Sequence, residues 1–334
     1  MGKNIVVCCD GTGNEYGTRN TNVVGVFAAL DKRHPDQQIA FYDPGVGTMS
    51  SPKAQTALNK GLSTALGLAF GLGMTRNIED AYLYLMRNYQ PDDRIFFFGF
   101  SRGAYTVRAL TGLLHKCGLL MPGSDNLIPY AVKLFRRHPQ SDTEWEVVRG
   151  FKKNFSRECK PHFIGLWDTV KTVGWFRRRV VLDFTAHNPD MKYGRHAVSI
   201  DEKRSQYRTN LWNYPNSDEV QEAWFAGVHS DVGGSYQERG LSDIALKWML
   251  EGAIQRGLLV DGDPFASIHP DPLIKMHNPL VPFWWMLGWK KRCIRRHPGV
   301  PGAEVWIHDS VRARMQHFGK GYQPRLPAAH RFVS

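Results

Sequence analysis

The pentapeptide Gly99-Phe100-Ser101-Arg102-Gly103 limits the possible fold of this chain more than any other feature. An apolar run, residues 94–98, precedes it, and a helix-like run, residues 104–116, follows it. A strand, a sharp turn and a helix form the context in which G-x-S-x-G lifts a serine hydroxyl above the edge of a sheet. Glycines are needed there because the turn is strained and neighbouring backbone passes close to it. We therefore predict a nucleophile elbow with Ser101 at its tip. The alternative is an ordinary Gly/Ser turn.

Other short apolar runs alternate with helix-like segments. Because this alternation is typical of parallel sheets, it favours an α/β fold with a mainly parallel, doubly wound sheet, similar to that of α/β-hydrolases. Adjacent Cys8 and Cys9 cannot face the same side of a strand, so we expect the first strand to be buried on both faces. Residues 55–74 are rich in glycine and favour a loop with a packed segment. The strand candidates are residues 5–9, 39–42, 94–98, 163–167 and 224–228, and the helix candidates are 21–30, 76–89, 104–116 and 242–256, with Ser242 as the N-cap of the last.

The length of 334 residues, 42% of them hydrophobic, is sufficient for one large core. We predict a single α/β-hydrolase-like domain, residues 1–334, with insertions. Residues 48–75 and 175–215 are lid candidates. Beyond residue 258 the chain is rich in proline and tryptophan, and it contains an aromatic and basic segment at residues 281–300.

The net charge of +12 favours an anionic partner, which could be nucleic acid, a membrane surface or an acidic substrate. The five cysteines show no metal-ligand spacing and suit a reducing compartment, so we expect no metal and no cofactor. The start of the chain does not resemble a signal peptide, and no apolar run is long enough to span a membrane. We therefore expect a cytoplasmic protein, with export without a cleaved signal and peripheral membrane association left open.

Four chemically suggestive side chains each follow a strand candidate: those of Asp10, Ser101, Asp168 and His229. Ligands bind beyond the carboxyl ends of strands in such sheets, so these groups are expected to share one site. Ser101, Asp168 and His229 also follow the chain order of α/β-hydrolase triads. We predict that His229 takes the proton of Ser101, that Asp168 orients His229, and that Ser101 forms an acyl-enzyme.

The developing oxyanion needs backbone N–H donors. We expect one from Arg102, directly after the nucleophile, and a second from Gly11 or Thr12 after the first strand. Two further assignments have rivals. His308 competes with His229, and Asp231 and Asp183 compete with Asp168.

Asp10 and Asp231 are expected to support the site. Asp10 could be purely structural, because its carboxylate can bind N–H groups of its own turn. A hard cation held by Asp10, Asp231 and Asp243 is an alternative, although no calcium-loop spacing supports it.

The segment 283–296 is aromatic first and then basic. This order suits a membrane interface, where tryptophan lies at headgroup depth and cations bind anionic lipids. A tryptophan cluster packed in the core and the stacking of single-stranded nucleic acid are the alternatives. The candidate surface residues are Trp284, Trp285, Trp289, Lys290, Lys291 and Arg292.

Several motifs together resemble the DUF2235 α/β-hydrolase family, which includes the Tle1-type phospholipase effectors of type VI secretion. The resemblance extends from near the N-terminus to about residue 311. It implies a Ser-Asp-His triad at Ser101, Asp168 and His229, and hydrolysis of ester bonds, with phospholipid as the best-known substrate class. The motifs are Cys9-Asp10-Gly11-Thr12-Gly13-Asn14, Arg76-Asn77-Ile78-Glu79-Asp80-Ala81-Tyr82, Gly99 to Tyr105, Trp167-Asp168-Thr169-Val170, Gly227 to Gly234 and His308-Asp309-Ser310-Val311.

We therefore expect a serine ester hydrolase that acts on phospholipid or another lipid ester, with peripheral contact to an anionic membrane and no nucleic-acid partner. Hydrolysis of soluble acyl esters or thioesters is the second hypothesis. A non-catalytic binder of anionic membrane or nucleic acid is the third.

Overall fold

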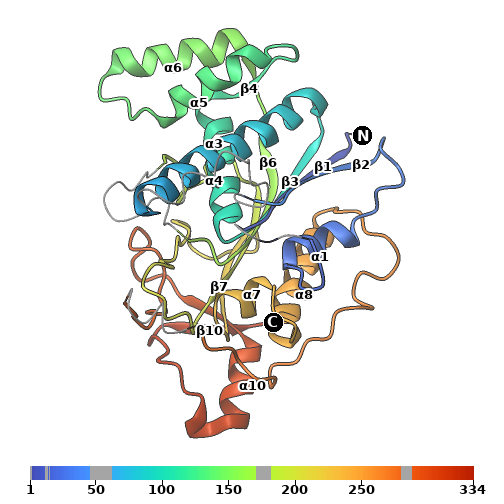
Figure 1. Ribbon diagram of the computed structural model, residues 1–334, viewed down its shortest axis with the longest axis vertical. Helices are drawn as coiled ribbons and strands as arrows, with labels where there is room; N and C mark the ends of the chain where they lie inside the picture. The colour runs from blue at the N-terminus through green and yellow to red at the C-terminus, as the bar shows by residue number, and fades with distance from the viewer. Residues whose placement is uncertain (1, 12–13, 15, 46–61, 171–181, 280–287) are drawn as a thin grey trace.

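The computed structural model of the chain describes residues 2–11, 14, 16–45, 62–170, 182–279 and 288–334, with the side chains of residues 62–72 excepted. Its centre is an eight-stranded sheet in the order β10-β9-β8-β7-β6-β3-β1-β2 (Figure 1). Every pairing given for this sheet is parallel. The strands are β1 (Asn4–Cys9), β2 (Gln38–Asp43), β3 (Arg94–Phe100), β6 (Pro161–Trp167), β7 (Tyr193–Ser199), β8 (Val220–Phe225), β9 (Val305–His308) and β10 (His330–Val333).

Helices cover both faces of the sheet, which gives the doubly wound arrangement predicted from the sequence (Figure 1). One core cluster packs α3, α4 and α5 against one face, and a second packs α1 and α8 against the other. A two-stranded sheet of β4 (Leu119–Leu120) and β5 (Ser156–Arg157) flanks the helical layer. The helices are α1 (Asn22–Ala29), α3 (Leu62–Asn88), α4 (Arg102–Cys117), α5 (Ile128–Arg136), α6 (Asp142–Phe155), α7 (His229–Gly233), α8 (Gly240–Gln255) and α10 (Asp309–Phe318).

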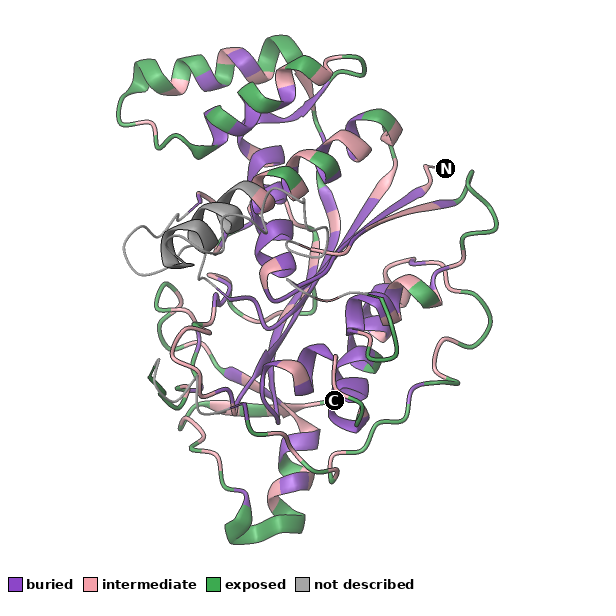
Figure 2. Cartoon of the chain, viewed as in Figure 1, coloured by how far each residue is buried: buried purple, intermediate pink, exposed green. Residues whose placement is uncertain are grey.

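Strand β1 lies inside the sheet between β2 and β3, and all six of its residues are buried (Figure 2). Cys9 belongs to the core cluster on one face and Cys8 to the cluster on the other. The prediction of a first strand buried on both faces is therefore confirmed.

The strand order reverses at β1. From β1 the chain runs through α1 to β2 on one side, and then returns through α3 to β3 on the other side. The adjacent carboxyl ends of β1 and β3 thus form a topological switch point, where doubly wound sheets bind ligands. Asp10 follows β1 and Ser101 follows β3, so both stand at this point.

Several predictions of local structure were wrong. Residues 62–74 are helical and belong to α3, where a loop was expected. Residues 193–199, inside the lid candidate 175–215, form the interior strand β7 and therefore cannot move as a lid. Ser242 lies inside α8, and Arg239 occupies the N-cap position. The other parts of the lid candidates at residues 48–61 and 175–181 lie outside the described residues.

No helix in the described part of the chain is both long enough and apolar enough to cross a membrane.

Candidate active site

Ser101 stands at a strained turn between β3 and α4. Its φ of 58° and ψ of −116° place it outside the regions that side chains favour. The flanking glycines are explained by close backbone. A Cβ on Gly99 would lie 2.7 Å from Cα of Ala104, and one on Gly103 would lie 2.1 Å from the carbonyl oxygen of Cys9. The local geometry therefore has the features of a nucleophile elbow.

Strand register brings Asp168 next to Ser101. Phe100 pairs with Trp167 across β3 and β6, and the backbone N–H of Ser101 donates to the carbonyl of Trp167 over 3.0 Å. The two strands therefore deliver Ser101 and Asp168 side by side at the same edge of the sheet. Asp168 also has a positive φ of 39° and is buried, which marks a second constrained turn.

His229 begins α7, directly after the turn that leaves β8. Its Nδ1 lies 2.5 Å from Oδ2 of Asp168. Because a carboxylate can only accept, Nδ1 carries the proton and Nε2 is left with the lone pair. The His229 ring also packs against Phe100, the residue before Ser101, with the ring centres 4.6 Å apart. The structure thus joins Asp168 and His229 directly, and links His229 to the elbow through Phe100.

Asp231 fixes the turn that precedes His229. Its Oδ2 accepts the N–H of Val228 over 3.0 Å, and its Oδ1 lies 2.7 Å from Nδ1 of His277. Gly227 has a φ of 110°, and a Cβ there would lie 2.5 Å from Cβ of Asp231. The supporting role expected for Asp231 therefore has a geometric basis in this turn.

Two opposing effects set the charge state of the dyad. Burial by itself raises the pKa of Asp168, but the positive charge of Arg292 and the hydrogen bond from His229 outweigh it and hold the pKa below its usual range. Burial lowers the pKa of His229, although Asp168 acts against this. Asp168 is therefore ionised and His229 is neutral near pH 7, which is the charge state that a general base and its orienting carboxylate would need.

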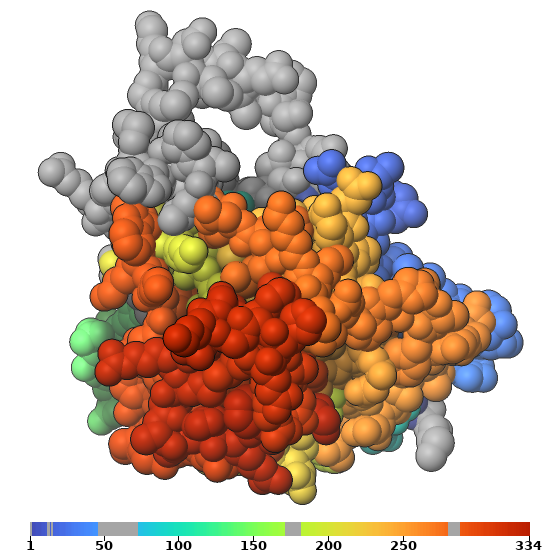
Figure 3. Space-filling view, turned by 90° about the horizontal axis from the view of Figure 1, so that it is seen from below, coloured from blue at the N-terminus to red at the C-terminus, as the bar shows by residue number. Residues whose placement is uncertain are grey.

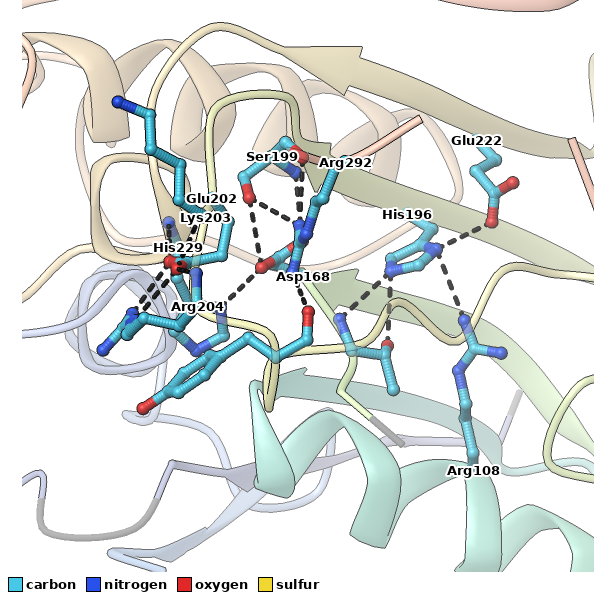
Figure 4. Close-up of polar contacts among 12 residues, drawn as sticks. Arg108, Asp168, His196, Ser199, Glu202, Lys203, Arg204, Glu222, His229 and Arg292 are labelled. Carbon is cyan, nitrogen blue, oxygen red and sulfur yellow. Dashed lines mark hydrogen bonds and ion pairs between the residues drawn. The ribbon is translucent and has the colours of Figure 1, made fainter. Parts of the chain in front are cut away.

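Arg292 and Ser199 complete the surroundings of Asp168 (Figure 4). Arg292 donates from Nη1 to Oδ1 of Asp168 over 2.6 Å, and its side chain is only 8% exposed. Ser199 at the end of β7 donates its backbone N–H to the same Oδ1 over 3.0 Å and lies with its hydroxyl 3.2 Å from Oδ2. Both carboxylate oxygens are thus held in place.

The loop after β7 holds His229 from the other side. Glu202 accepts the backbone N–H of His229 over 3.2 Å and binds the guanidinium of Arg204 through both of its oxygens. Arg204 lies 3.7 Å above the ring of Tyr207, which in turn meets the His229 ring edge-on at 4.8 Å. The ring of His229 is therefore fixed by aromatic contacts and its backbone by a carboxylate.

Asp10 accepts the hydrogen bond of one backbone N–H group that was expected to form the oxyanion hole. The N–H of Gly11 donates to Oδ1 of Asp10 over 2.6 Å, so it does not offer itself as an oxyanion donor in this conformation. Gly11 is nevertheless close to Ser101, because a Cβ on Gly11 would lie 3.3 Å from Cβ of Ser101. The N–H of Arg102 lies in the first turn of α4, where helix N–H groups point outward. Thr12 lies outside the described residues.

Asp10 ties β1 to its surroundings. Its Oδ2 accepts the hydroxyls of Thr21 over 2.6 Å and Tyr42 over 2.9 Å. Thr21 is in turn the N-cap of α1. Burial raises the pKa of Asp10, and these hydrogen bonds act against the rise. The geometry therefore favours the structural interpretation of Asp10.

The alternative cation site is not assembled. Asp231 binds His277, and Asp243 binds the guanidinium of Arg239 over 3.0 Å. Within the described ranges, no group of three or more histidine, cysteine, aspartate or glutamate residues could hold a metal ion.

The rival residues lie elsewhere. His308 stacks on Phe225 with ring centres 4.6 Å apart and caps the first turn of α10. Burial lowers its pKa to about 4. Asp183 pairs with Lys116 over 2.9 Å and with His138 over 2.7 Å. Neither replaces His229 or Asp168.

The described part of the aromatic and basic segment contains both exposed and buried side chains. Trp289 is 53% exposed, and Lys290 and Lys291 are also exposed. The prediction that Arg292 belongs to the same surface is wrong, because its guanidinium is buried against Asp168. Trp284 and Trp285 lie outside the described residues.

A second buried pair of histidine and carboxylate lies beside the first (Figure 4). His196 on β7 accepts the N–H of Thr169, next to Asp168, over 3.3 Å, so its Nδ1–H donates to Glu222 over 2.8 Å. Glu222 also binds Nη1 of Arg296 over 2.9 Å and the N–H of Trp212 over 2.8 Å. The two pairs share the turn at residues 168–169.

Three residues around Asp168 and His229 were not predicted from the sequence: Ser199, Glu202 and, in its buried position, Arg292. Ser199 could have been found, because it ends a strand, but the sequence Tyr193–Ser199 mixes charged and apolar residues and was not recognised as one. Arg292 carries no such signal, since its partner is 124 residues away in the chain.

Comparison with protein-family models identifies one family for this chain. The model of the catalytic domain of Tle1-like phospholipase effectors of the type VI secretion system matches residues 3–252. The uncharacterized protein YEL023C of Saccharomyces cerevisiae is 33% identical over 220 residues, which cover 62% of this chain and 32% of that protein. The chain thus spans about a third of the length of this curated relative.

Two solved structures are also similar. An uncharacterized protein from Pseudomonas aeruginosa is 18% identical, with a TM-score of 0.47, over 81% of this chain and 49% of that one. The Tle1 effector bound to the VgrG spike is 19% identical, with a TM-score of 0.39, over 71% of this chain and 51% of that one. Because the family model matches well over half of its residues, the chain belongs to the Tle1-like phospholipase effector family.

Proposed function

We propose that this protein is a serine ester hydrolase that cleaves acyl ester bonds of phospholipids through Ser101, His229 and Asp168. The observation that carries the proposal is the hydrogen bond between His229 and Asp168 at the sheet edge where Ser101 forms a strained elbow. This arrangement supplies a nucleophile, a neutral base and an orienting carboxylate.

The reaction would proceed in two steps. The Ser101 Oγ attacks the ester carbonyl carbon while its proton passes to Nε2 of His229. His229 then gives that proton to the departing lysophospholipid oxygen as the C–O bond breaks, which leaves an acyl group on Ser101. In the second step a water attacks the acyl carbon and its proton passes to Nε2 of His229. The bond between the acyl carbon and Oγ of Ser101 then breaks, His229 returns the proton to Oγ, and the fatty acid leaves.

The preference for a lipid substrate rests on family membership and on the exposed residues beside the site. The family is described as phospholipase effectors. Trp289, Lys290 and Lys291 are exposed on the segment that supplies Arg292 to Asp168, so a lipid surface in contact with them would lie near the catalytic residues. Tryptophan beside lysine suits the headgroup layer of an anionic membrane.

The first test compares wild type with Ser101→Ala on mixed anionic liposomes, with the products identified by mass spectrometry. Ser124→Ala, at a surface turn, is the matched control. We expect fatty acid and lysophospholipid from wild type and the control, and none from folded Ser101→Ala. Turnover by folded Ser101→Ala would overturn the serine mechanism.

Other outcomes select the alternatives. Turnover of soluble esters or thioesters without lipid turnover would favour the second hypothesis. Salt-sensitive binding to anionic vesicles that is unchanged by Ser101→Ala, with no turnover of any ester, would favour the non-catalytic binder.

A further inference from the structure

Residues 288–296 form a strap that runs beside the catalytic dyad. Its backbone pairs with the loop that holds His229: Lys290 N–H donates to the carbonyl of Lys203 over 2.8 Å, and Ser205 N–H donates to that of Gly288 over 3.3 Å. After Lys291 the side chains alternate in burial. Ile294 and Arg296 are buried and Arg292 is nearly so, whereas the residues between them are exposed.

The two inward arginines each meet a buried carboxylate. Arg292 binds Asp168, and Arg296 binds Glu222. The space-filling view shows this part of the chain and the residues that follow it, in orange and red, covering one end of the molecule (Figure 3). The strap therefore contributes charge to the interior as well as a surface.

Arg292 makes more than one contact in the site. Nη1 donates to Oδ1 of Asp168 over 2.6 Å, to the Ser199 hydroxyl over 2.6 Å and to the Ser199 carbonyl over 2.9 Å. Nη2 donates to the carbonyl of Tyr207 over 2.8 Å. The guanidinium thus joins the ends of β6 and β7 to the loop whose Tyr207 ring packs on His229.

The position of the charge has a chemical consequence. Oδ2 of Asp168 faces His229, whereas Oδ1 faces Arg292, so the carboxylate is shared between two cations once His229 is protonated. A charge already paired on one side stabilises a new imidazolium less strongly than a free one. Arg292 therefore opposes protonation of His229 while it fixes the orientation of Asp168.

We propose that Arg292 is a positioning residue that locks Asp168 toward His229 and keeps His229 unprotonated, and so available as a base, at mildly acidic pH. This inference rests on the proposed function, because it concerns the same Ser101 reaction. Arg292 acts through Asp168, and its effect is therefore expected in the pH dependence as well as in the rate.

Other charged groups also face His229. Glu202 and Asp168 favour its protonated form, and Arg204 disfavours it; Tyr207 faces the ring, and Asp231 lies on the same short helix. These groups are present in wild type and in every Arg292 variant. A shift between wild type and an Arg292 variant can therefore be assigned to Arg292.

The test measures kcat/KM for a soluble p-nitrophenyl ester, and the rate of Ser101 labelling by a fluorophosphonate, from pH 4.5 to 9. The variants are Arg292→Met, which removes the charge, and Arg292→Lys, which keeps it. Arg295→Met, on the outward side of the strap, is the control for loss of one charge. Ser101→Ala tests the underlying function separately.

We expect Arg292→Met to move the acidic limb of both profiles to higher pH by about 1 unit, because the imidazolium gains the full charge of Asp168. The maximal rate should fall about tenfold or more as Asp168 loses its fixed orientation. Arg292→Lys should retain the wild-type limb with a lower maximal rate, and Arg295→Met should match wild type.

Equal loss of rate in both Arg292 variants with an unmoved limb would overturn the proposal, since it would indicate a purely structural role. If Arg292→Met does not fold, the uncharged and polar Arg292→Gln replaces it: a limb moved to higher pH supports the proposal, and a wild-type limb overturns it. Turnover and labelling that persist in Ser101→Ala would overturn the proposed function instead.

Discussion

At the scale of single residues, the neighbouring atoms determine whether a position can hold a side chain or requires glycine. Gly103 and Gly150 both lie inside helices, α4 and α6. A Cβ on Gly103 would meet the carbonyl oxygens of Cys9 and Asp10 at 2.1 and 2.5 Å, whereas a Cβ on Gly150 would meet nothing within 4 Å. Gly103 is therefore required by the close approach of β1, and Gly150 has no such requirement.

We predict opposite effects of alanine at these two positions. Gly103→Ala should lower the free energy of unfolding by about 2–3 kcal/mol, because backbone at the end of β1 cannot move aside cheaply. Gly150→Ala should raise it by up to about 1 kcal/mol through helix propensity. Urea denaturation of both variants tests this, and a Gly103→Ala variant as stable as wild type would contradict the packing argument.

The site residues differ in how far the sequence indicates them. Ser101, Asp168 and His229 each follow a buried run of residues, so their positions after strands are enough to identify them as candidate site residues. The contact of Gly11 with Asp10 could not be foreseen, because it depends on the local direction of one N–H. The sequence predicts Arg292 on the surface, because a run of tryptophan and basic residues does not reveal which cationic side chains point inward.

At the scale of elements, strands β7 and β8 carry charge inside the sheet. His196 and Glu222 are fully buried on these neighbouring strands, and Arg296 of the strap reaches Glu222 from outside the sheet. Burial raises the pKa of Glu222, but the hydrogen bond from His196 and the charge of Arg296 bring it below the usual range. Glu222 is therefore an ionised side chain surrounded by donors.

Glu222→Gln should lower the free energy of unfolding by about 3–5 kcal/mol. The amide has nearly the same shape, but it leaves Arg296 without a buried counter-charge, and its NH2 group must face a donor. Glu219→Gln, directly before β8 and exposed, is the matched control. Thermal unfolding monitored by circular dichroism measures the difference, and equal melting temperatures for the two variants would show that the cluster is not needed.

The elements that sequence reasoning misjudged share a physical cause. Helix α3 contains glycines that lower helix propensity, yet residues 74–86 of it bury a continuous apolar face against the sheet. Strand β7 reads Tyr-Gly-Arg-His-Ala-Val-Ser, where buried polar residues hide the usual apolar run. Tertiary contacts therefore outweigh local preference in both elements: residues 74–86 anchor α3 in the core, and His196 of β7 belongs to the charged cluster with Glu222.

At the scale of the whole molecule, the parallel sheet gathers the carboxyl ends of its strands at one edge, and the α/β class follows reliably from the alternation of strand and helix patterns. The charge of +12 indicates an anionic partner without showing which surface it binds. The exposed Trp289, Lys290 and Lys291 lie on the strap, so they offer one location for that contact.

We predict that binding to anionic vesicles depends on these positions more than on total charge. Lys290→Ala with Lys291→Ala should weaken binding about 30-fold, since each lysine near a lipid surface contributes about 1 kcal/mol. Lys133→Ala with Lys153→Ala, on α5 and α6 at the other end of the molecule from α10, removes the same charge (Figure 1). Vesicle sedimentation at low and high salt separates the pairs, and equal weakening by both would indicate diffuse attraction.

The position of Arg292 in the chain also affects how a shorter catalytic fragment would behave. The family match ends at residue 252, after Ser101, Asp168 and His229 but before the strap. A chain trimmed there would retain the three side chains of the proposed triad. Asp168 and Glu222 would lose their arginine partners, and β8 would lose its neighbour β9. During synthesis on the ribosome, Asp168 and Glu222 likewise lack both arginine partners until residue 296 has emerged. The proposed nucleophile Ser101 is thus translated early, whereas the arginines that balance the buried charges of Asp168 and Glu222 are translated late.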